Sequence, residues 1–287
     1  MNRAHIKKIL AESELAPKKK LGQNFLVCQE TVARIIELAQ VKATDQVVEL
    51  GVGLGSLTLP LARQVDKVIG LEVDRGIIRY HQEEQDLPGN VQLIHQDLLT
   101  HDFPELAATL GQRLKIIANL PYSISNPLLF KLLEIREHVD WAVLMLQKEV
   151  GQRLAARSGT KEYGILSVLF QGCSTIDNLL AVPASKFHPR PKVDSLVIKI
   201  DMRPPPYPDE VLPDPQLLTR LVKAGFGKRR KTLVNALTSS GLGLEKSLVQ
   251  QAIGACGLDP RIRAEALEYG DFLRLSQQLA SHLPTPS

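Results

Sequence analysis

A short apolar stretch that runs directly into a glycine-rich turn limits what this chain can fold into. Residues 46–50 read as a buried strand, and Gly51, Gly53 and Gly55 follow it before a helical pattern begins. Further strand-like segments at residues 67–74, 91–95 and 115–118 alternate with helical ones. Such alternation is typical of α/β proteins. The sequence therefore predicts a parallel, doubly wound sheet.

Polar side chains stand where the predicted strands end. Glu72 lies near the end of the second strand, about 20 residues beyond the glycines, where dinucleotide-binding folds place a ribose-binding acid. Asp97 follows the third strand and Asn119 follows the fourth. Ligands on open parallel sheets bind at the carboxyl ends of the strands. We therefore expect the glycine turn, Glu72, Asp97 and Asn119 to line one crevice.

The fourth strand leads into Asn119-Leu120-Pro121-Tyr122, and helical spacing resumes only after Pro127. Pro121 has no N–H and a fixed φ, so this backbone is expected to be stiff. Asn-x-Pro-Tyr is also turn chemistry, and by itself the stretch fits a surface turn equally well. Its position at a strand end, beside the glycine turn, favours an active-site loop.

The glycine spacing points to the cofactor. Nicotinamide and flavin folds use Gly-x-Gly-x-x-Gly to hold a pyrophosphate at a helix N-terminus. This chain instead has Glu49-x-Gly51-x-Gly53-x-Gly55, which suits S-adenosylmethionine, a ligand with an amino-acid tail and no phosphate. Glu49 would lie near the tail ammonium, the backbone at Gly53 would pass close to the ligand, and Glu72 would accept hydrogen bonds from the ribose hydroxyls.

A methyltransferase reading gives Asn119, Leu120 and Tyr122 a chemical role. The exocyclic amine of adenine is a poor nucleophile because its lone pair is delocalised into the ring. The side-chain oxygen of Asn119 and the carbonyl of Leu120 can each accept one N–H and aim the lone pair at the methyl group. Tyr122 can stack on a base that has left its helix. Positioning and hydrogen-bond acceptors would then supply most of the catalysis, without a metal.

Length and composition predict the domain organisation. The 287 residues suit about two domains, and 44% hydrophobic residues are ordinary for a globular protein. A proline-rich stretch at residues 204–208 marks a boundary. We expect a catalytic domain over residues 1–203 and a helical domain over residues 204–287. The basic N-terminal arm of the catalytic domain is expected to be flexible.

Charge and cysteines set the expected partners and compartment. The formal net charge of +4 permits a nucleic-acid partner without requiring one. Cys28, Cys173 and Cys256 form no Cys-x-x-Cys pair, so neither a disulfide framework nor a zinc site is predicted, which fits a reducing cytoplasm. No targeting or membrane-spanning segment is predicted.

Several stretches together resemble a known family. They are residues 22–26 (Gly-Gln-Asn-Phe-Leu), 49–58, 119–125, 146–150, 163–164, 187–195 and 226–233. They resemble the ribosomal RNA adenine dimethyltransferases, most closely the bacterial small-subunit KsgA/RsmA family. Their spread over nearly the whole chain argues against a chance match.

The resemblance implies a Rossmann-like S-adenosylmethionine-dependent catalytic domain with a smaller, all-helical C-terminal domain. It implies two methyl groups on N6 of each of two adjacent adenosines in the 3′-terminal hairpin of 16S rRNA, added late in small-subunit assembly. By the same resemblance the cofactor contacts are Asn24, Leu26, Gly51, Glu72, Asp97 and Asn119. Asn119, Tyr122 and Phe187 hold the target adenine, although Phe187 alone would be read as core packing.

Three positions depart from the family pattern. Val52 stands where a proline is usual, which is expected to loosen the glycine turn slightly. Ser123 stands where an asparagine is usual, so a hydrogen bond of that side chain near the substrate is in question. Ile165 stands where an arginine is usual, which could remove one RNA or structural contact.

Positive charge is concentrated in the C-terminal part, at Arg220, Lys223, Lys228, Arg229, Arg230 and Lys231. Such a run is usually a solvated helical face. Because the chain resembles enzymes that act on RNA, we expect Lys228, Arg229, Arg230 and Lys231 to contact phosphates. Such contacts position RNA without reading its sequence.

Three alternatives remain from the sequence. A large-subunit (23S) adenine methyltransferase of the macrolide-resistance type shares the catalytic motifs, but the long C-terminal part and residues 192–195 favour the small-subunit family. The glycine spacing disfavours a nicotinamide oxidoreductase. Asn119 and Tyr122 disfavour a non-catalytic assembly factor. The expected partner is 16S rRNA within the small ribosomal subunit or its precursor, bound by a cytoplasmic monomer with no membrane or metal partner.

Overall fold

The computed structural model describes residues 3–12, 22–202, 215–228 and 230–282. The chain divides into two compact units, one of residues 1–151 and 176–202 and the other of residues 152–175 and 203–287. None of the described helices is long and apolar enough to cross a membrane.

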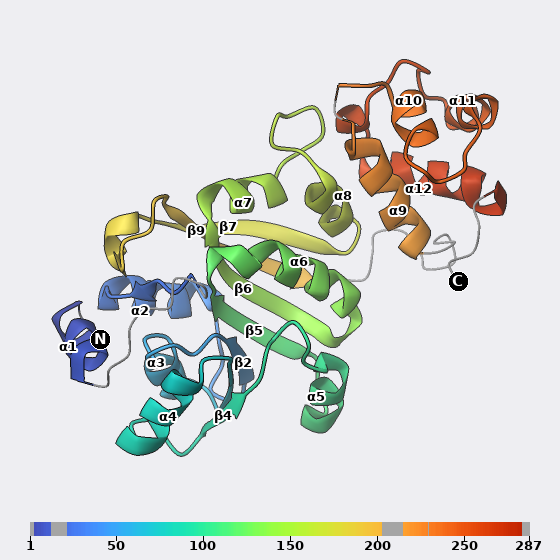
Figure 1. The fold of residues 1–287 in the computed structure, drawn as a ribbon. Helices are drawn as coiled ribbons and strands as arrows, with labels where there is room; N and C mark the ends of the chain where they lie inside the picture. Colours follow the sequence, from blue (N-terminus) through green and yellow to red (C-terminus); the bar gives the residue numbers. More distant parts are fainter. Residues whose placement is uncertain (1–2, 13–21, 203–214, 229, 283–287) are drawn as a thin grey trace. The chain divides into compact units, whose positions relative to one another are not determined.

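A seven-stranded sheet forms the centre of the first unit (Figure 1), with the strand order β4-β3-β2-β5-β6-β9-β7. Strands β2 to β6 pair in parallel, and β9 runs antiparallel to β6. The bounds are β2 Gln46–Leu50, β3 Lys67–Glu72, β4 Val91–His95, β5 Leu114–Asn119, β6 Val139–Gln147, β7 Ser174–Val182 and β9 Ser195–Met202.

The predicted doubly wound α/β fold is confirmed, and the four strands that indicated a parallel sheet, β2 to β5, do pair in parallel. Strand β9 differs from these four, because it runs antiparallel to β6. Strand β7 was not predicted, because Ser174–Val182 begins with polar residues and most of its positions are exposed or half-buried. A strand with no clean apolar alternation gives little periodic signal.

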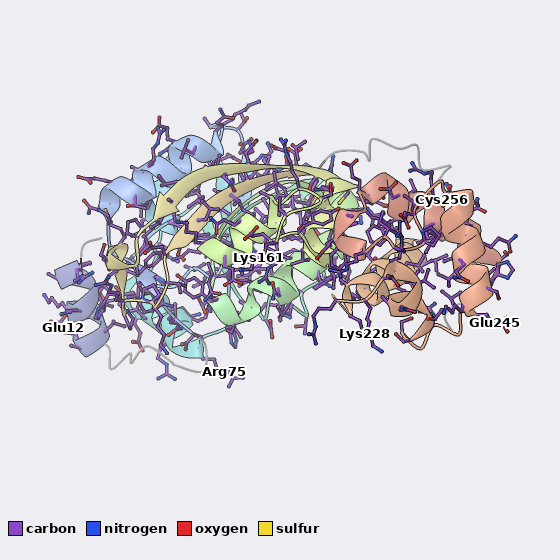
Figure 2. The ribbon with its side chains drawn as sticks, turned by 90° about the horizontal axis from the view of Figure 1, so that it is seen from above. Glu12, Arg75, Lys161, Lys228, Glu245 and Cys256 are labelled. Carbon is purple, nitrogen blue, oxygen red and sulfur yellow. The ribbon has the colours of Figure 1, made fainter. Side chains whose placement is uncertain are left out.

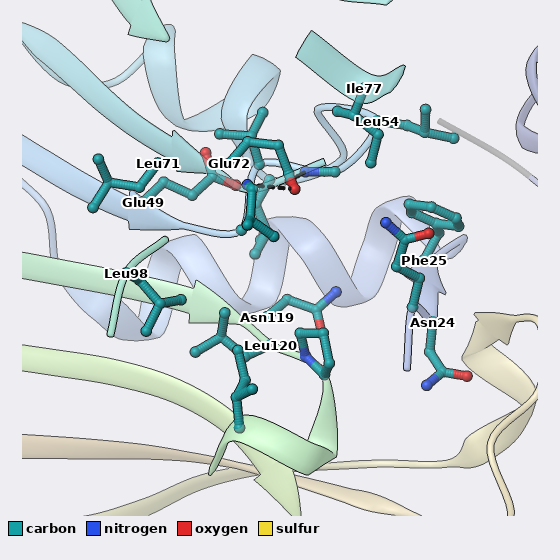
Figure 3. A pocket seen from close by; sticks show the side chains of 18 of the residues that line it. Asn24, Phe25, Glu49, Leu54, Leu71, Glu72, Ile77, Leu98, Asn119 and Leu120 are labelled. Atoms are coloured by element: carbon teal, nitrogen blue, oxygen red, sulfur yellow. Dashed lines mark hydrogen bonds between the residues drawn. The ribbon is translucent and has the colours of Figure 1, made fainter. Parts of the chain in front are cut away.

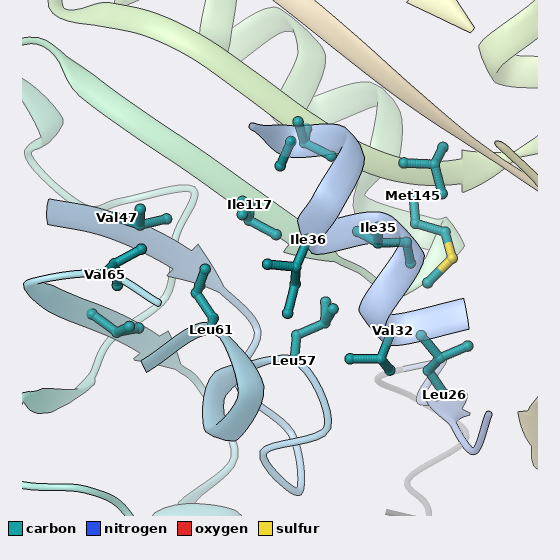
Figure 4. Close-up of a cluster of buried hydrophobic side chains, with 14 of the residues drawn as sticks. Leu26, Val32, Ile35, Ile36, Val47, Leu57, Leu61, Val65, Ile117 and Met145 are labelled. Atoms are coloured by element: carbon teal, nitrogen blue, oxygen red, sulfur yellow. The ribbon is translucent and has the colours of Figure 1, made fainter. Parts of the chain in front are cut away.

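Helices cover the sheet, and buried residues identify the contacts. Helices α2 (Gln29–Ala39) and α3 (Thr58–Ala62) bury apolar side chains against one face, among them Ile36 and Leu61 against Val47 and Ile117 (Figure 4). The other helices of this part of the chain are α1 Arg3–Glu12, α4 Arg75–Glu84, α5 Phe103–Leu110, α6 Ser125–Glu134 and α7 Lys148–Leu154. Strand neighbours that point the other way, such as Val48 and Ile116, are also fully buried, so both faces of the sheet are covered.

Two details near the chain's functional loops differ from expectation. Residues 3–12 form helix α1, with Ile6 and Ile9 buried, where the sequence predicted a flexible arm; Lys18 to Lys20 lie outside the described residues. Helix α6 begins at Ser125, two residues before Pro127. A proline is tolerated in the first helical turn because its missing N–H has no intrahelical partner there.

The second unit is helical apart from the short start of β7. Its helices are α8 Ile165–Gln171, α9 Pro215–Phe226, α10 Leu233–Thr238, α11 Lys246–Ala255 and α12 Tyr269–Leu279, and the last four pack on one another. Its core includes Leu221, Leu237, Ile253 and Phe272, all fully buried. The predicted smaller helical part at the C-terminus is therefore confirmed.

Candidate active site

Strand register brings the predicted site residues to one edge of the sheet. Leu50 at the end of β2 pairs with Leu71 of β3 on one side and with Ala118 of β5 on the other. The chain therefore turns to opposite sides of β2 at this edge, which is the topological switch point where open α/β sheets bind ligands. Gly51 and Asn119 follow directly at that point, level with each other.

A pocket of about 190 Å³ opens at this switch point (Figure 3). Figure 3 shows Glu49 and Glu72 on one side of it, with Asn119 and Leu120 across from them. The predicted site residues that line it are Asn24, Leu26, Glu49, Gly51, Gly53, Glu72, Asp97, Asn119 and Leu120. The structure thus gathers every predicted cofactor residue around one pocket.

The glycine turn needs its glycines. Gly51, Gly53 and Gly55 have φ of 77°, 54° and 78°, a region that other residues rarely adopt. A Cβ on Gly51 would also lie 3.1 Å from Leu120 Cδ2, so the glycine turn and the Asn119 loop pack closely. The loop of Asn119 and Leu120, which carries the predicted catalytic residues, is therefore held against the glycine turn, which carries predicted cofactor residues.

Both polar groups of the Gly53 residue are held by side chains. The Gly53 N–H donates to Glu72 Oε2 at 2.9 Å, and the Gly53 carbonyl accepts from His81 Nε2 at 2.8 Å. His81 is 3% exposed, and its Nδ1 lies 2.7 Å from Asp86 Oδ1. His81, on α4, thus fixes the turn from behind while Glu72 fixes it from the pocket side.

Glu72 is oriented by backbone donors. Besides Gly53, the N–H groups of Val73 and Asp74 donate to Glu72 Oε1 at 2.9 and 2.8 Å. A carboxylate offers about four lone-pair sites. Three are met by the protein, and the side chain lines the pocket at the end of β3, where a ribose hydroxyl can use the remaining site.

Glu49 is a buried carboxyl at the bottom of the pocket. Burial raises the pKa of Glu49 to about 8; the nearby Thr58 hydroxyl lowers it in part, and the charge of Glu72 raises it further. Among the described residues, Glu49 Oε2, Ser56 Oγ and Thr58 Oγ1 have no hydrogen-bond partner of normal geometry. A buried polar group without a partner is destabilising, so this cluster is suited to a polar ligand group.

These residues fit S-adenosylmethionine. The unpaired oxygens of Glu49 and Ser56 can receive the ammonium and carboxylate of an amino-acid tail, and Glu72 can receive ribose. The rest of the lining is largely apolar, including Leu54, Leu71, Ile77 and Leu98, as a nucleoside requires. Asp97 is exposed after β4, and its Oδ1 accepts from Leu99 N at 2.9 Å, which leaves carboxylate lone pairs facing the pocket rim.

A two-stranded ladder ties Leu26 to Phe187. Strand β1 (Phe25–Leu26) pairs antiparallel with β8 (Phe187–His188), Leu26 opposite Phe187. Asn24 precedes β1, and its Nδ2 donates to the Gly22 carbonyl at 2.9 Å. Phe187 is 1% exposed and belongs to the apolar core rather than to the pocket lining. Its assignment to the base pocket stays a prediction.

Tyr122 lies beside the pocket, and its hydroxyl is hydrogen-bonded to the hydroxyl of Ser195. It begins a short 3-10 turn, Tyr122–Ile124, directly after Pro121. The Tyr122 hydroxyl lies 2.8 Å from Ser195 Oγ, and Ser195 is fully buried at the start of β9. Burial raises the pKa of Tyr122, with an opposing effect of the Ser195 hydrogen bond. The ring is therefore neutral and fixed in orientation at physiological pH.

Comparison with known proteins identifies the family. Residues 14–281 match the family described as ribosomal RNA adenine dimethylase. The chain belongs to this family. A protein of Desulfotalea psychrophila named ribosomal RNA small subunit methyltransferase A is 46% identical over 275 residues, 93% of this chain and 92% of that one. A Geobacter metallireducens protein of the same name is 42% identical and covers 91% and 95%.

Solved structures agree in fold. A dimethyladenosine transferase from Plasmodium falciparum superposes with a TM-score of 0.71 at 26% identity, covering 90% of this chain and 98% of that one. The 23S rRNA methyltransferase ErmE gives 0.64 at 23% identity and covers 89% and 99%, a likeness of fold. Membership of the dimethylase family confirms the resemblance seen in the sequence and S-adenosylmethionine as the cofactor, and it overturns the nicotinamide alternative.

The structure shows the surroundings of the three residues that depart from the dimethylase pattern. Val52 is 4% exposed, and a Cβ on Gly70 would lie 2.4 Å from Val52 Cγ2, so the valine packs into space that Gly70 leaves. Ser123 lines the pocket and is exposed. Ile165 is the first residue of α8 and is half-buried.

The basic cluster follows α9 in the second unit, where Figure 2 labels Lys228. Lys228, Arg230 and Lys231 are exposed, and no described carboxylate pairs with them; Arg229 lies outside the described residues. An uncompensated group of cations of this kind suits phosphate contacts.

Sequence reasoning missed His81 and Ser195. His81 carried no signal, because a histidine in a helical pattern gives no hint that it reaches a glycine turn 28 residues earlier. Ser195 stood in a stretch that resembled the family, but only the packing of β9 beside β6 shows that its hydroxyl reaches Tyr122.

Proposed function

We propose that this chain transfers methyl groups from S-adenosylmethionine to N6 of two adjacent adenosines in the 3′-terminal hairpin of 16S rRNA, dimethylating each. The substrate is the small ribosomal subunit or its precursor in the cytoplasm, and the chain acts as a monomer. The observation that carries the proposal is the shared edge at which Glu49, Gly53 and Glu72 meet Asn119 and Leu120 in one pocket. The relatives named small subunit methyltransferases support the choice of rRNA.

The cofactor is assigned to the deeper side of this pocket. Glu49 and Ser56 would hold the tail, Glu72 the ribose, and Asp97 and Leu98 the adenine end, while Asn24 and Leu26 close the side formed by β1. S-adenosylmethionine supplies an electrophilic methyl group when bound. The residues of the chain contribute orientation and exclude water, since most of the lining is apolar.

The target base is assigned to the Asn119 side. The Asn119 side-chain oxygen and the Leu120 carbonyl would each accept one N–H of the adenine amine, which turns its lone pair out of conjugation and toward the methyl group. Tyr122 would stack on the flipped base, and Phe187 would support the opposite side. As the methyl group arrives the N–H becomes strongly acidic, so preorganised acceptors stabilise the transition state most. The remaining proton on N6 allows a second transfer by the same route.

The helical residues 204–287 are assigned to RNA binding through Lys228, Arg229, Arg230 and Lys231. Each phosphate contact contributes about 0.7 to 0.9 to the slope of log affinity against log salt. Changing the four residues to glutamine is expected to weaken binding to small subunits and to flatten this slope. An unchanged slope would remove the cluster from the binding surface.

The proposal is tested with unmethylated small and large subunits and labelled S-adenosylmethionine. Label is expected in small-subunit RNA, and Tyr122→Ala is expected to abolish transfer while cofactor affinity stays within about twofold, because the ring is assigned to the base alone. Label in large-subunit RNA would favour the macrolide-resistance type of activity, and no label in either would favour a non-catalytic assembly factor. Loss of cofactor binding in Tyr122→Ala would mean that the ring is misassigned.

A further inference from the structure

Helix α1 is docked at a defined place on the catalytic unit. Its buried residues Ile6 and Ile9 pack in one apolar cluster with Phe25, Leu54 and Ile77, which themselves line the cofactor pocket. Arg3 Nη2 donates to the Ser185 and Phe187 carbonyls, at 2.6 and 3.2 Å. The helix is therefore held from both its apolar and its polar side, next to the turn that carries Phe187.

The outer face of α1 is cationic. Arg3, Lys7 and Lys8 are exposed on it, and its C-terminal residue Glu12, labelled in Figure 2, pairs with Lys8 at 3.7 Å. No described carboxylate pairs with Lys7. Residues 1–20 contain six Lys or Arg and two Glu, a net +4 that equals the formal net charge of the whole chain. The first twenty residues therefore carry a local excess of positive charge.

The cations of α1 meet others from a distant part of the sequence. The turn Ala184–Lys186 and β8 bring Lys186 and His188 beside α1, since Arg3 bonds to this turn and Phe25 of β1 pairs with His188. Burial lowers the pKa of His188, and the charges of Lys7 and Arg3 lower it further. The field at His188 is therefore positive. We call Arg3, Lys7 and Lys186 the α1 cationic patch.

Arg3, Lys7 and Lys186 place three positive charges near one turn. Arg3 donates to backbone carbonyls and Lys186 Nζ donates to Cys28 Sγ at 3.4 Å, whereas the charge of Lys7 has no described carboxylate partner. We propose that the α1 cationic patch binds backbone phosphates of the rRNA strand beside the target adenosine. The proposal rests on the function proposed above, because the patch borders the turn of Phe187, where the target base is assigned. The patch would give the catalytic unit an RNA-binding site of its own, separate from the Lys228–Lys231 cluster.

Substitution of Lys7 tests this proposal without disturbing the docking of α1. Lys7→Gln in the full chain is expected to weaken binding to unmethylated small subunits several-fold near 0.1 M salt and to lower the salt slope by about 0.7 to 0.9, the value for one phosphate contact. Lys7→Arg is expected to restore both. Cofactor affinity, thermal stability and the rate at saturating subunit concentration should stay at wild-type values.

Lys8→Gln is the matched control, because it removes one charge from the same helix at a lysine that already pairs with Glu12. Its effect on the slope should be less than half that of Lys7→Gln. An unchanged slope in Lys7→Gln, or equal effects of the two variants, would overturn the patch as a phosphate site. These outcomes are distinct from failure of the proposed function, in which wild-type protein would leave the small subunit unmethylated.

Discussion

The buried carboxyl of Glu49 should couple cofactor binding to pH. With a pKa of about 8, its carboxyl is about 90% protonated at pH 7 in the cofactor-free protein. In the proposed placement the ammonium of the cofactor tail would bind the ionised form, so binding at pH 7 should release about 0.9 proton from Glu49. Ionising it costs about 1.4 kcal/mol at that pH. The association constant should therefore rise about ninefold from pH 6 to pH 7 and level off above pH 8.

Isothermal titration calorimetry in buffers of different ionisation enthalpy measures this proton directly. Glu49→Gln should lose the release and show the affinity deficit mainly above pH 7, because glutamine has no proton to give up and no charge to offer. A matched ligand control is 5′-deoxy-5′-methylthioadenosine, which lacks the amino-acid tail and should bind without release. Wild-type release persisting in Glu49→Gln, or absent from the wild type, would refute the placement of the tail at Glu49.

Three further predictions use the same geometry. Tyr122→Phe and Ser195→Ala each remove one half of a hydrogen bond, so each should lower kcat/KM by about three- to tenfold and the double variant no more than either; additive losses would show that the hydroxyls act separately. His81→Phe frees the Gly53 carbonyl and should raise KM for the cofactor by up to about tenfold at constant kcat and RNA affinity; a fall in kcat alone would contradict this role. The folded state holds the Glu49 proton more tightly than the unfolded state, so this stabilisation is complete below about pH 4.5 and is lost as pH rises toward 8. Urea unfolding of the cofactor-free protein at pH 6 and pH 8 should therefore show that the wild type loses about 2 kcal/mol more than Glu49→Gln, and equal losses would contradict it.

Much of the candidate site could be predicted because its signals are local. Strand β2, the glycines after it and the acid at the end of β3 follow from apolar runs, turn residues and spacing, and their convergence follows from the rule for parallel sheets. The Asn119 loop was ambiguous by itself, because a proline turn and an active-site loop use the same residues. Its neighbours decided between them.

The elements that were missed depend on contacts between distant parts of the chain. Strand β7 is mostly exposed or half-buried and has little periodicity, so only pairing at the edge of the sheet makes it a strand. Helix α1 was read as a flexible arm, because Ile6 and Ile9 are a short apolar signal in a basic stretch; their partners lie at Phe25, Leu54 and Ile77. The hydrogen bond from Ser195 to Tyr122 spans 73 residues, a distance at which no spacing rule applies.

Mapping the modified bases shows which adenosines of the rRNA the protein methylates. Unmethylated small subunits are incubated with the protein and S-adenosylmethionine, and the 16S rRNA is then read by reverse transcription, which stops at an adenine that has lost both N6 hydrogens. Stops are expected at two adjacent adenosines of the 3′-terminal hairpin, and none is expected at these positions with Asn119→Ala. Stops elsewhere in the RNA, or none with a protein that binds the cofactor, would contradict it.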